Sequence, residues 1–443
     1  MASAPPISGS VGNQPVSQLG SVQAEMQRLL KAGICLFSSN EEGQALAAFK
    51  KAYRLSGSLP EPRSSQAKCL FNLGAAYIVT GKPQKGLKCL LKAKELGAEE
   101  EDGDLSFNVG AAYDDMREYA KAAEFYRKAI QEYSTNQTQS AADALIKLAY
   151  CLVNTGDVES AAQSFRLAGQ AYQGVQLPED AAMAMREAAN YFLRSPGYSP
   201  DDVLESLQAC SQSCTKIKNR ELLGKLYNHL GLHYAEMRCF RQAEQHFDAA
   251  LRLCSGKGFS VQKKAVLLQN LGAACNALEC FERALQYHSE AADMYGALGE
   301  RAAQAQCHYN LATAHGQLKN YDMAGFYSQQ ALKAFVDAGD SYGEAQACEQ
   351  LGMTHLCQGH FGPAIHYYKQ ALALFEKSKE ASEIPRKRIR EKLAAVANSQ
   401  TNAQDEFADS AITDSLLHPP ECGAYSPALK GRLIGETLLQ NQH

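Results

Sequence analysis

Small and aromatic residues recur along this chain in a fixed order. A glycine or alanine is followed twelve residues later by a second small residue, which opens the phrase Ala-x-x-x-aromatic-x-x-Ala. The best copies are Gly33 with Ala45, Phe49 and Ala52; Gly110 with Ala122, Tyr126 and Ala129; Gly231 with Ala243, Phe247 and Ala250; and Gly352 with Ala364, Tyr368 and Ala371. The i, i+4, i+7 spacing places each phrase on one face of a helix, whereas a strand would alternate.

Four looser copies complete the pattern. They are Gly74 with Gly86, Leu90 and Ala93; Ala149 with Ala161, Phe165 and Ala168; Gly272 with Ala284, His288 and Ala291; and Ala312 with Ala324, Ser328 and Ala331. The period is close to forty residues. Turn-forming runs such as 80–83 and 154–157 separate the two halves of a unit, which predicts stacked pairs of antiparallel helices. A plain helix bundle or coiled coil would need neither the period nor the small residues.

The spacing of the copies also predicts how the chain is divided. Between the phrases at 161 and 243 the interval is about twice the period, so we expect a degenerate unit there, interrupted by Pro196 and Pro200. The expected parts are a flexible leader over 1–27, repeats 1–4 over 28–178, a degenerate fifth repeat over 179–220, repeats 6–9 over 221–378, a capping helix over 379–397 and a disordered tail over 398–443. Residues 407–417 in that tail are amphipathic, and they are either a docking helix or without function.

The phrase Phe-Asn-Leu-Gly-Ala-Ala-Tyr at 71–77, together with the Ala-x-x-x-aromatic-x-x-Ala phrases, resembles the tetratricopeptide repeat. The resemblance covers about 28–378 and implies an all-α, right-handed superhelical solenoid of about nine helix-turn-helix repeats, eight clear and one degenerate. The usual repeat has about 34 residues. The longer repeats here, which lack the usual closing proline, resemble those of LGN, rapsyn and kinesin light chain.

The resemblance implies a binding groove along the first helices. Two positions before each small residue, polar side chains recur: Asn72, Asn108, Lys147, His229, Asn270, Asn310 and Gln350. In the family this row faces the concave groove, and similar asparagine rows in O-linked GlcNAc transferase and kinesin light chain hold the backbone of an extended peptide. A carboxamide can donate and accept at once, and each such bond contributes about 1 kcal/mol. The alternative is that these amides bond within their own repeat.

The residue before each of these positions is the floor of the expected groove. The row is Phe71, Phe107, Ile146, Asn228, Gln269, Tyr309 and Glu349, apolar in the first block and more polar in the second. Asp114, Asp115 and Glu236 would add negative charge at the far ends of the helices. Lys68 and Lys225 alone do not rebuild the carboxylate clamp of chaperone-binding relatives. We therefore expect the groove to bind an extended or helical segment of a protein partner whose identity is open.

Composition narrows the partners and the compartment. The net charge is -4 and the pI is near 6.3, which gives no electrostatic case for nucleic acid. Residues 1–18 lack the apolar core of a signal peptide, and no apolar run is long enough to span a membrane. Fourteen cysteines without a Cys-x-x-Cys motif favour reduced thiols in the cytoplasm. The basic run Pro385–Arg390 is either a nuclear localisation signal or the solvated face of the terminal helix.

Catalytic and metal sites are not expected. His229, His233 and Cys239 have a spacing that can hold zinc, but no fourth ligand recurs nearby. Cys210 and Cys214 lie one helical turn apart, as core cysteines do. Phosphate loops and nucleophile motifs do not occur. We expect no enzyme, no cofactor and no metal, but a binding scaffold or adaptor. The alternative is a structural component that self-associates through its convex or end surfaces, and the oligomeric state is open.

Overall fold

The computed structural model describes residues 14–59, 62–97, 103–197, 199–254, 260–377 and 383–405, without the side chains of 14–19, 135 and 397–405. Over these ranges the protein is all-α, with nineteen α-helices and one short 3₁₀ helix. It divides into two compact units, Met1–Lys216 and Ile217–His443, which are treated separately below as the N-terminal and C-terminal units. The all-α fold expected from the sequence is therefore confirmed.

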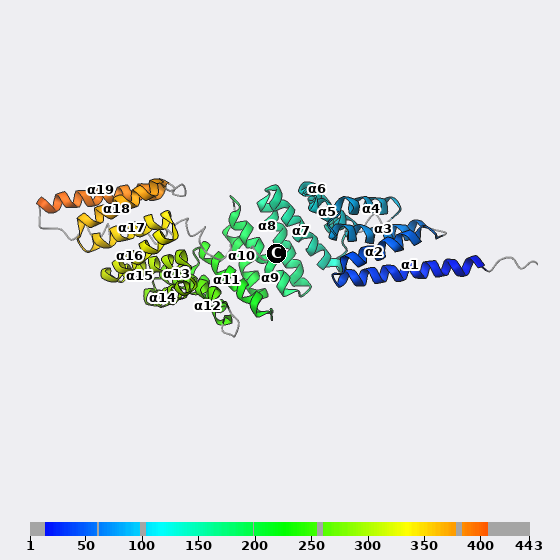
Figure 1. Cartoon of the computed structure of the whole chain (residues 1–443), viewed down its shortest axis with the longest axis horizontal. Helices are drawn as coiled ribbons and strands as arrows, with labels where there is room; N and C mark the ends of the chain where they lie inside the picture. Colours follow the sequence, from blue (N-terminus) through cyan, green and yellow to red (C-terminus); the bar gives the residue numbers. More distant parts are fainter. Residues whose placement is uncertain are drawn as a thin grey trace, which may run out of the picture. The chain divides into compact units, whose positions relative to one another are not determined.

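In the N-terminal unit ten helices pack in consecutive pairs, and each pair also contacts the next (Figure 1). The helices are α1 (Gln14–Ser38), α2 (Glu42–Ser56), α3 (Pro62–Val79), α4 (Pro83–Glu95), α5 (Gly103–Asp115), α6 (Tyr119–Glu132), α7 (Thr138–Thr155), α8 (Val158–Gly174), α9 (Pro178–Arg194) and α10 (Pro200–Cys214), with the 3₁₀ helix η1 (Thr135–Gln137) before α7. This is the stacked arrangement that the forty-residue period predicts.

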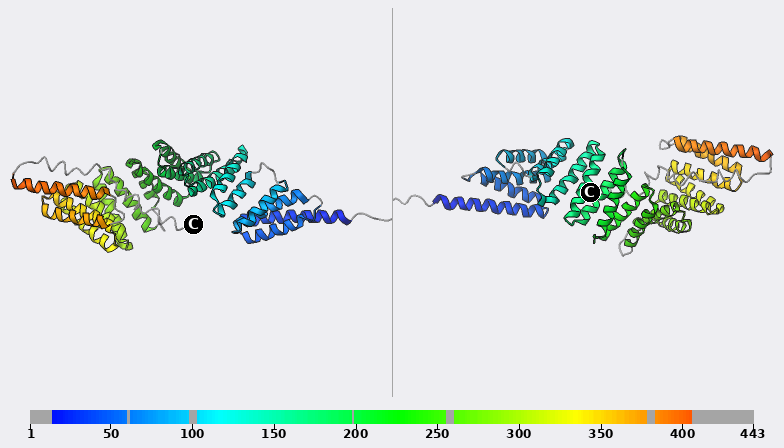
Figure 2. Two further views of the ribbon diagram at one scale, coloured as in Figure 1. Left: turned by 90° about the horizontal axis from the view of Figure 1, so that it is seen from above. Right: turned by 180° about the vertical axis from the view of Figure 1, so that it is seen from behind.

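The C-terminal unit continues the same pairing (Figure 2). Its helices are α11 (Arg220–Glu236), α12 (Phe240–Leu253), α13 (Val261–Ala277), α14 (Phe281–Leu298), α15 (Arg301–Gln317), α16 (Tyr321–Ala338), α17 (Ser341–Cys357), α18 (Phe361–Lys377) and α19 (Glu383–Asp405). The last helix, α19, packs against α18 and has no following helix in the described part of the chain. About nine helix pairs are thus present, as in a tetratricopeptide-type solenoid.

The recurring small residue has a steric cause in both units. A Cβ placed on Gly33 would lie 2.5 Å from the ring of Phe49, and one placed on Gly231 would lie 2.5 Å from the ring of Phe247. These rings are almost fully buried between the paired helices. Because interiors are close-packed, a larger residue at the glycine would force the ring to move. The sixteen-residue interval from glycine to ring is therefore the packing interface of one repeat.

The turn inside most repeats has one conformation. One residue of each turn adopts positive φ: Asn40, Gly81, Arg117, Gly156, Arg238, Glu279, Lys319 and Gly359. The next backbone N–H donates to the carbonyl five residues back, for example from Lys82 to Tyr77 at 2.8 Å and from Cys239 to Tyr234 at 2.8 Å. This is the Schellman arrangement, which ends the first helix and starts the second in a fixed direction.

Stacked rings join the two helices of several repeats near these turns. In the N-terminal unit Tyr113 stacks on Phe125, with ring centroids 5.5 Å apart. In the C-terminal unit a histidine takes one side of each pair: Tyr234 with His246, His315 with Tyr327, and His355 with Tyr367, with interplanar angles of 6° or 7°. These ring pairs were not predicted from the sequence, although both members stand three residues after the small residues of the repeat.

The ends of the chain differ from the expected boundaries. Helix α1 begins at Gln14, so the leader expected over 1–27 is helical from that residue. Met26 explains the earlier start, because it is buried against Ala52, Leu59 and Cys69. Helix α19 runs to Asp405, beyond the expected end at 397. The tail segment 407–417 lies outside the described residues.

The degenerate fifth repeat corresponds to α9 and α10. Helix α9 ends at Arg194 and α10 begins at Pro200, so the helix is interrupted where the two prolines predicted a break, and Pro200 occupies the first turn of α10. The stripe expected for the second helix, Val203, Leu207 and Cys210, is fully buried. This repeat therefore packs like its neighbours despite its divergent sequence.

Candidate functional site

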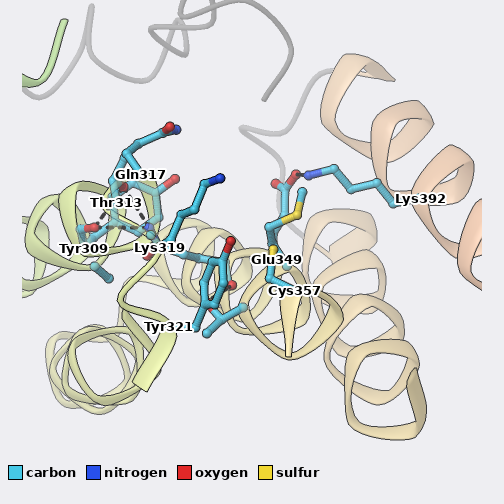
Figure 3. A pocket seen from close by; sticks show the side chains of 13 residues that line it. Tyr309, Thr313, Gln317, Lys319, Tyr321, Glu349, Cys357 and Lys392 are labelled. Carbon is cyan, nitrogen blue, oxygen red and sulfur yellow. Dashed lines mark hydrogen bonds and ion pairs between the residues drawn. The ribbon is translucent and has the colours of Figure 1, made fainter. Parts of the chain in front are cut away.

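In the C-terminal unit, the predicted groove rows border a cavity of about 420 Å³. Its walls come from α15, the turn that follows α15, α17 and α19 (Figure 3). The lining residues are Tyr309, Ala312, Thr313, Gly316, Gln317, Lys319, Tyr321, Glu349, Gln350, Met353, Thr354, Cys357 and Lys392. Two of the predicted site residues, Tyr309 and Gln350, thus meet in one hollow, together with Glu349 of the expected floor.

Hydrogen bonds between successive first helices fix the amide of Gln350. Its Nε2 donates to the Tyr309 carbonyl at 3.3 Å and to Thr313 Oγ1 at 2.7 Å. Because a carbonyl only accepts, the amide nitrogen must be the atom that faces Tyr309. The other amide atom, Oε1, is buried and has no hydrogen-bond partner among the described residues. Gln350 therefore retains an unused acceptor at the cavity.

Glu349 is a buried carboxylate held by two cations from the terminal helix. Arg388 binds it through both oxygens, with Nε and Nη2 at 2.8 and 2.6 Å, and Lys392 Nζ lies 2.8 Å from Oε1. Burial alone would raise the pKa of Glu349, but Lys392 and Arg388 hold it below its usual range. The carboxylate is therefore ionised and neutralised from within the chain (Figure 3).

Apolar packing fixes α19 where these cations need it. Ile389 and Val396 are fully buried in a cluster with Tyr368 and Phe375 of α18. Arg386 Nε also donates to the Phe375 carbonyl near the end of α18. Helix α19 thus covers the apolar face of α18, as expected of the helix that caps the last repeat of an array.

The basic run predicted as a nuclear signal or a solvated face lies in α19, and its charges are paired. Arg386 and Arg390 pair with Glu383, and Lys387 lies near Glu391. Arg388 departs from the solvated-face interpretation, because it reaches inward to Glu349. Arg388 therefore forms its ion pair with Glu349, about one repeat earlier in the chain.

Other amides of the predicted row also bond within the array. In the C-terminal unit Asn270 Nδ2 donates to Asn228 Oδ1 at 3.1 Å, which joins α13 to α11. The Asn310 carbonyl accepts from Asn276 at 3.3 Å, and Asn310 Oδ1 accepts from Gln306 at 3.4 Å. His229 has interactions of its own. Most of these bonds join successive repeats, and only the bond from Gln306 to Asn310 fits the alternative that the amides bond within their own repeat.

In the N-terminal unit the row is less engaged. Asn72 Nδ2 donates to the Lys68 carbonyl of its own helix at 2.9 Å. Asn108 is half-buried, and no hydrogen bond of its side chain occurs within the described ranges. Lys147 is exposed and interacts electrostatically with Asp114. Asn108 is thus the carboxamide of this unit that is best placed to bond an incoming backbone.

The expected apolar floor of the N-terminal unit is half-buried. Phe71 and Ile146 pack against buried residues between successive repeats, and the ring of Phe107 meets that of Tyr126 edge-on, with centroids 5.4 Å apart. Each side chain therefore belongs partly to the core and partly to the surface. A guest segment at this surface would bury further apolar area without disturbing the fold.

Two neighbouring carboxylates, Asp114 and Asp115, lie at the end of α5. Burial raises the pKa of Asp114, although Lys147 opposes the shift. Burial and then the charge of Asp114 raise the pKa of Asp115. Both shifts favour the neutral, protonated carboxyl group, so burial opposes the negative charge that was expected here from the sequence.

The histidines and cysteines singled out in the sequence form no metal cluster in the described ranges. Cys210 and Cys214 are both buried, and Cys210 Sγ donates to the Ala182 carbonyl at 3.2 Å. This is the environment of a core cysteine.

Several cavity residues were not predicted from the sequence, among them Thr313, Lys319, Tyr321, Met353 and Lys392. A signal for some of them was present, because Thr313 and Met353 each follow the small residue of their repeat directly. Lys392 stands about one repeat after Glu349. Residues one repeat apart in the sequence occupy equivalent positions on neighbouring helices. Side chains with this spacing, such as Glu349 and Lys392, can therefore contact each other.

The fold and the repeated packing unit define a helical repeat protein. Two segments match family models described as tetratricopeptide repeat, residues 304–377 and residues 104–136. These two segments therefore carry tetratricopeptide repeats, and the first match covers α15 to α18, which include most of the cavity wall. Across the described residues, no helix combines the length and apolar character that crossing a membrane requires.

Solved structures of helical repeat proteins are similar to the chain at low identity. BtubC (BKLC) from P. vanneervenii is 20% identical, with 55% of this chain and 91% of that chain covered and a TM-score of 0.35. The apo form of RapI is 13% identical, with 80% and 98% covered and a TM-score of 0.49. YrrB, described as a TPR protein with an unusual peptide-binding site, is 19% identical, with 48% and 96% covered and a TM-score of 0.33. The assignment therefore rests on the two matched segments and on the helix packing.

Proposed function

We propose that this protein is a non-catalytic scaffold or adaptor whose first helices bind an extended or helical segment of a partner protein. The observation that carries the proposal is the cavity of about 420 Å³, where Tyr309 and Gln350 of the predicted rows meet on successive first helices. Its lining mixes apolar side chains with oriented donors and acceptors, as binding of a peptide requires. Tetratricopeptide repeats generally act as protein-interaction modules, which supports the same function.

The finer resemblances belong to this proposal. The forty-residue repeats resemble those of LGN, rapsyn and kinesin light chain, and the phrases at 71–77, 226–232 and 269–272 also resemble those of tetratricopeptide repeat protein 24. Neither resemblance names a partner. Within this chain, the residues proposed to contact a guest are Asn108 and the floor residues Phe71, Phe107 and Ile146 in the N-terminal unit, and Tyr309, Gln350 and the cavity in the C-terminal unit.

The hydrogen bonds change how the amide row acts in this proposal. Asn72 and Asn270 each donate one amide N–H to a protein atom, and Gln350 Nε2 donates twice. The bonds of Asn270 and Gln350 join successive first helices and hold them in register, which reduces the entropy lost when a guest binds. The side chain of Asn108 and the second N–H group of Asn72 remain for direct contact.

A selection experiment tests the proposal. Peptides from a random phage-displayed library would be selected on the intact chain, and their affinity measured by fluorescence anisotropy for wild type, Asn108→Ala and Gln350→Ala. We expect at least one groove variant to bind its selected peptide about fivefold more weakly, since a hydrogen bond contributes about 1 kcal/mol. Gln329→Ala is the matched control, because Gln329 is an exposed amide on the second helix α16. Peptides that bind all three variants like wild type would contradict the proposal.

The alternative is self-association through the outer helices or the end surfaces. Phe326 and Val336 on α16 favour it, since each is about half exposed despite being apolar. Sedimentation velocity over a range of concentrations separates the two functions. A constant monomer mass supports peptide capture, and a mass that rises with concentration and falls after Phe326→Ser supports assembly.

A further inference from the structure

The cavity of the C-terminal unit is positively charged, although it is lined by an acid. Among the described residues that line it, Glu349 is the single acid, whereas Lys319 and Lys392 bring two ammonium groups. Arg388 stands behind the wall on the same carboxylate. Glu349 pairs with Arg388 and Lys392, and Lys319 adds a third cation, so the formal net charge of these four groups is +2.

The two lysines approach the opening from opposite walls. Lys319 lies in the turn after α15, and Lys392 comes from α19 (Figure 3). Lys392 is committed to Glu349, but the side chain of Lys319 has no hydrogen-bonded or charged partner in the described parts of the chain. Figure 3 shows its ammonium group extended into the space that faces the Glu349–Lys392 pair. An exposed cation aimed into a hollow is available to a ligand.

Neutral groups around this cation complete a polar lining. Burial and then the nearby Glu349 carboxylate raise the pKa of Tyr309 to about 12, so its hydroxyl stays protonated. Tyr321 and Gln317 lie beside Lys319 in the same wall (Figure 3). The site thus offers a cation and hydroxyl groups to an anion.

We propose that this cavity binds an acidic residue of the guest segment, with the anionic side chain at Lys319 and Lys392. The inference deepens the proposed function and rests on it, because it names the chemistry that the groove selects. The anionic group is a carboxylate or a phosphate ester, and both present oxygens that ammonium groups bind strongly. Helix α19 is then part of the binding site as well as the cap of the array.

Blocked single residues test this subsite without any selected peptide. N-acetyl-glutamate α-amide, the corresponding blocked phosphoserine and blocked glutamine would each be titrated into the intact chain. The methyl group of Met353, which lines the cavity, reports binding by ¹³C NMR, and Met294, which does not line it, is the reference. We expect the acidic residues to shift Met353 with an affinity about fivefold higher than that of blocked glutamine, and to lose affinity at high salt.

Variants identify the cation responsible. Lys319→Gln is expected to weaken the acidic ligand about threefold, because one exposed charge contributes little more than that. Lys333→Gln removes an exposed lysine of α16 that does not line the cavity and should change nothing. The stronger of blocked glutamate and blocked phosphoserine shows which anion the site prefers.

The inference fails if neither acidic residue binds better than blocked glutamine, or if Lys319→Gln and Lys333→Gln act alike. Failure of the proposed function gives a different result: the selected peptides would bind Asn108→Ala and Gln350→Ala as tightly as wild type. Selected peptides that bind at the groove but lack acidic residues would retain the function and overturn the subsite.

Discussion

The two units are built from the same repeat but differ in chemistry. All eleven histidines lie after residue 217 and none before it. The floor row begins with Phe71, Phe107 and Ile146 in the N-terminal unit, whereas the C-terminal unit ends the row with Tyr309 and Glu349. The shared part of the sequence, small residues against rings, sets the fold. The part that differs, on the first helices, sets what each unit can bind and how each responds to pH.

The largest difference concerns charge at the inner surface. Glu349 takes a position that is apolar in the N-terminal unit, and it depends on Arg388 and Lys392. Replacing both cations, in Arg388→Met with Lys392→Met, should destabilise the docking of α19 by about 3 kcal/mol, because a buried carboxylate is left unpaired. Hydrogen exchange of residues 383–396, followed by mass spectrometry, measures this loss.

Lys387→Met is the matched control on the same helix. Lys387 is exposed and lies 3.9 Å from Glu391, so its loss should change the stability by less than about 0.5 kcal/mol. Equal exchange in the double variant and in the control would show that Glu349 needs no partner.

The contact between glycine and ring should be tighter in some repeats than in others. A Cβ on Gly231 would lie 2.5 Å from the Phe247 ring, but one on Gly110 would lie 3.0 Å from the Tyr126 ring. We expect Gly231→Ala to cost about 2 to 3 kcal/mol and Gly110→Ala about 1 kcal/mol, within the range for overpacked cores. Urea unfolding followed by circular dichroism compares them, and a reversed order would refute the steric explanation of the repeat pattern.

Acid should weaken the C-terminal unit selectively. Burial lowers the pKa of His288 to about 3, and burial also lowers the pKa values of His246, His315 and His355. Below pH 6.5 these histidines bind protons in the unfolded chain but stay neutral in the folded chain. The free energy of unfolding therefore falls as the pH falls. His288 alone should account for about 2 kcal/mol between pH 6.5 and pH 5.

The N-terminal unit should behave in the opposite way. Burial raises the pKa values of Asp114 and Asp115, so the folded state binds protons more readily than the unfolded state and gains stability as the pH falls toward those pKa values. Hydrogen exchange at pH 5 and pH 7.5, corrected for intrinsic rates, compares residues 284–298 with residues 122–132. If the corrected exchange rates of both segments changed in the same direction, the opposite pH responses predicted for the two units would be wrong.

His288→Phe sharpens this test, because phenylalanine occupies the same position in the repeats of Phe49 and Phe247. The substitution should remove most of the acid sensitivity near α14. His366→Gln, at an exposed histidine of α18, should leave it unchanged.

The smallest effect on stability is expected for substitutions in the turns, whose backbone conformation is the same in both units. Arg117 in one unit and Glu279 in the other hold φ near 60°, a conformation that costs a side-chain-bearing residue about 1 kcal/mol. Arg117→Gly and Glu279→Gly should each stabilise their repeat by only about 0.5 kcal/mol, because the greater chain entropy that glycine loses on folding offsets part of the relieved strain. Melting temperatures measure both, and a loss of stability in either variant would mean that the side chain contributes more than the backbone strain.

The fold could be predicted from the sequence because its determinants are local. The interval from Gly231 to Phe247 lies within one repeat, and steric contact at that interval defines the helix pair. The early start of α1 could not be predicted in this way. It depends on Met26 reaching Ala52 and Cys69, and no repeated phrase marks that contact.

The candidate site could be predicted only in part for a related reason. The rows placed Tyr309 and Gln350 correctly beside one cavity. However, the partners of the amides, such as Asn228 for Asn270 and Thr313 for Gln350, depend on side-chain rotamers across adjacent repeats. The spacing of one repeat suggests which helices meet, and it does not specify which atoms bond. Glu349 and Arg388 are 39 residues apart, about one repeat, and this spacing alone did not show that their side chains form an ion pair.

Site-specific photocrosslinking tests the central claim most directly. The crosslinker p-benzoylphenylalanine would replace Gln317 in the cavity wall or Phe326 on the outer helix α16, and each chain would be irradiated with a peptide selected on the wild type. The account predicts that position 317 crosslinks to the peptide and that position 326 does not. Crosslinking at 326 with none at 317 would contradict it.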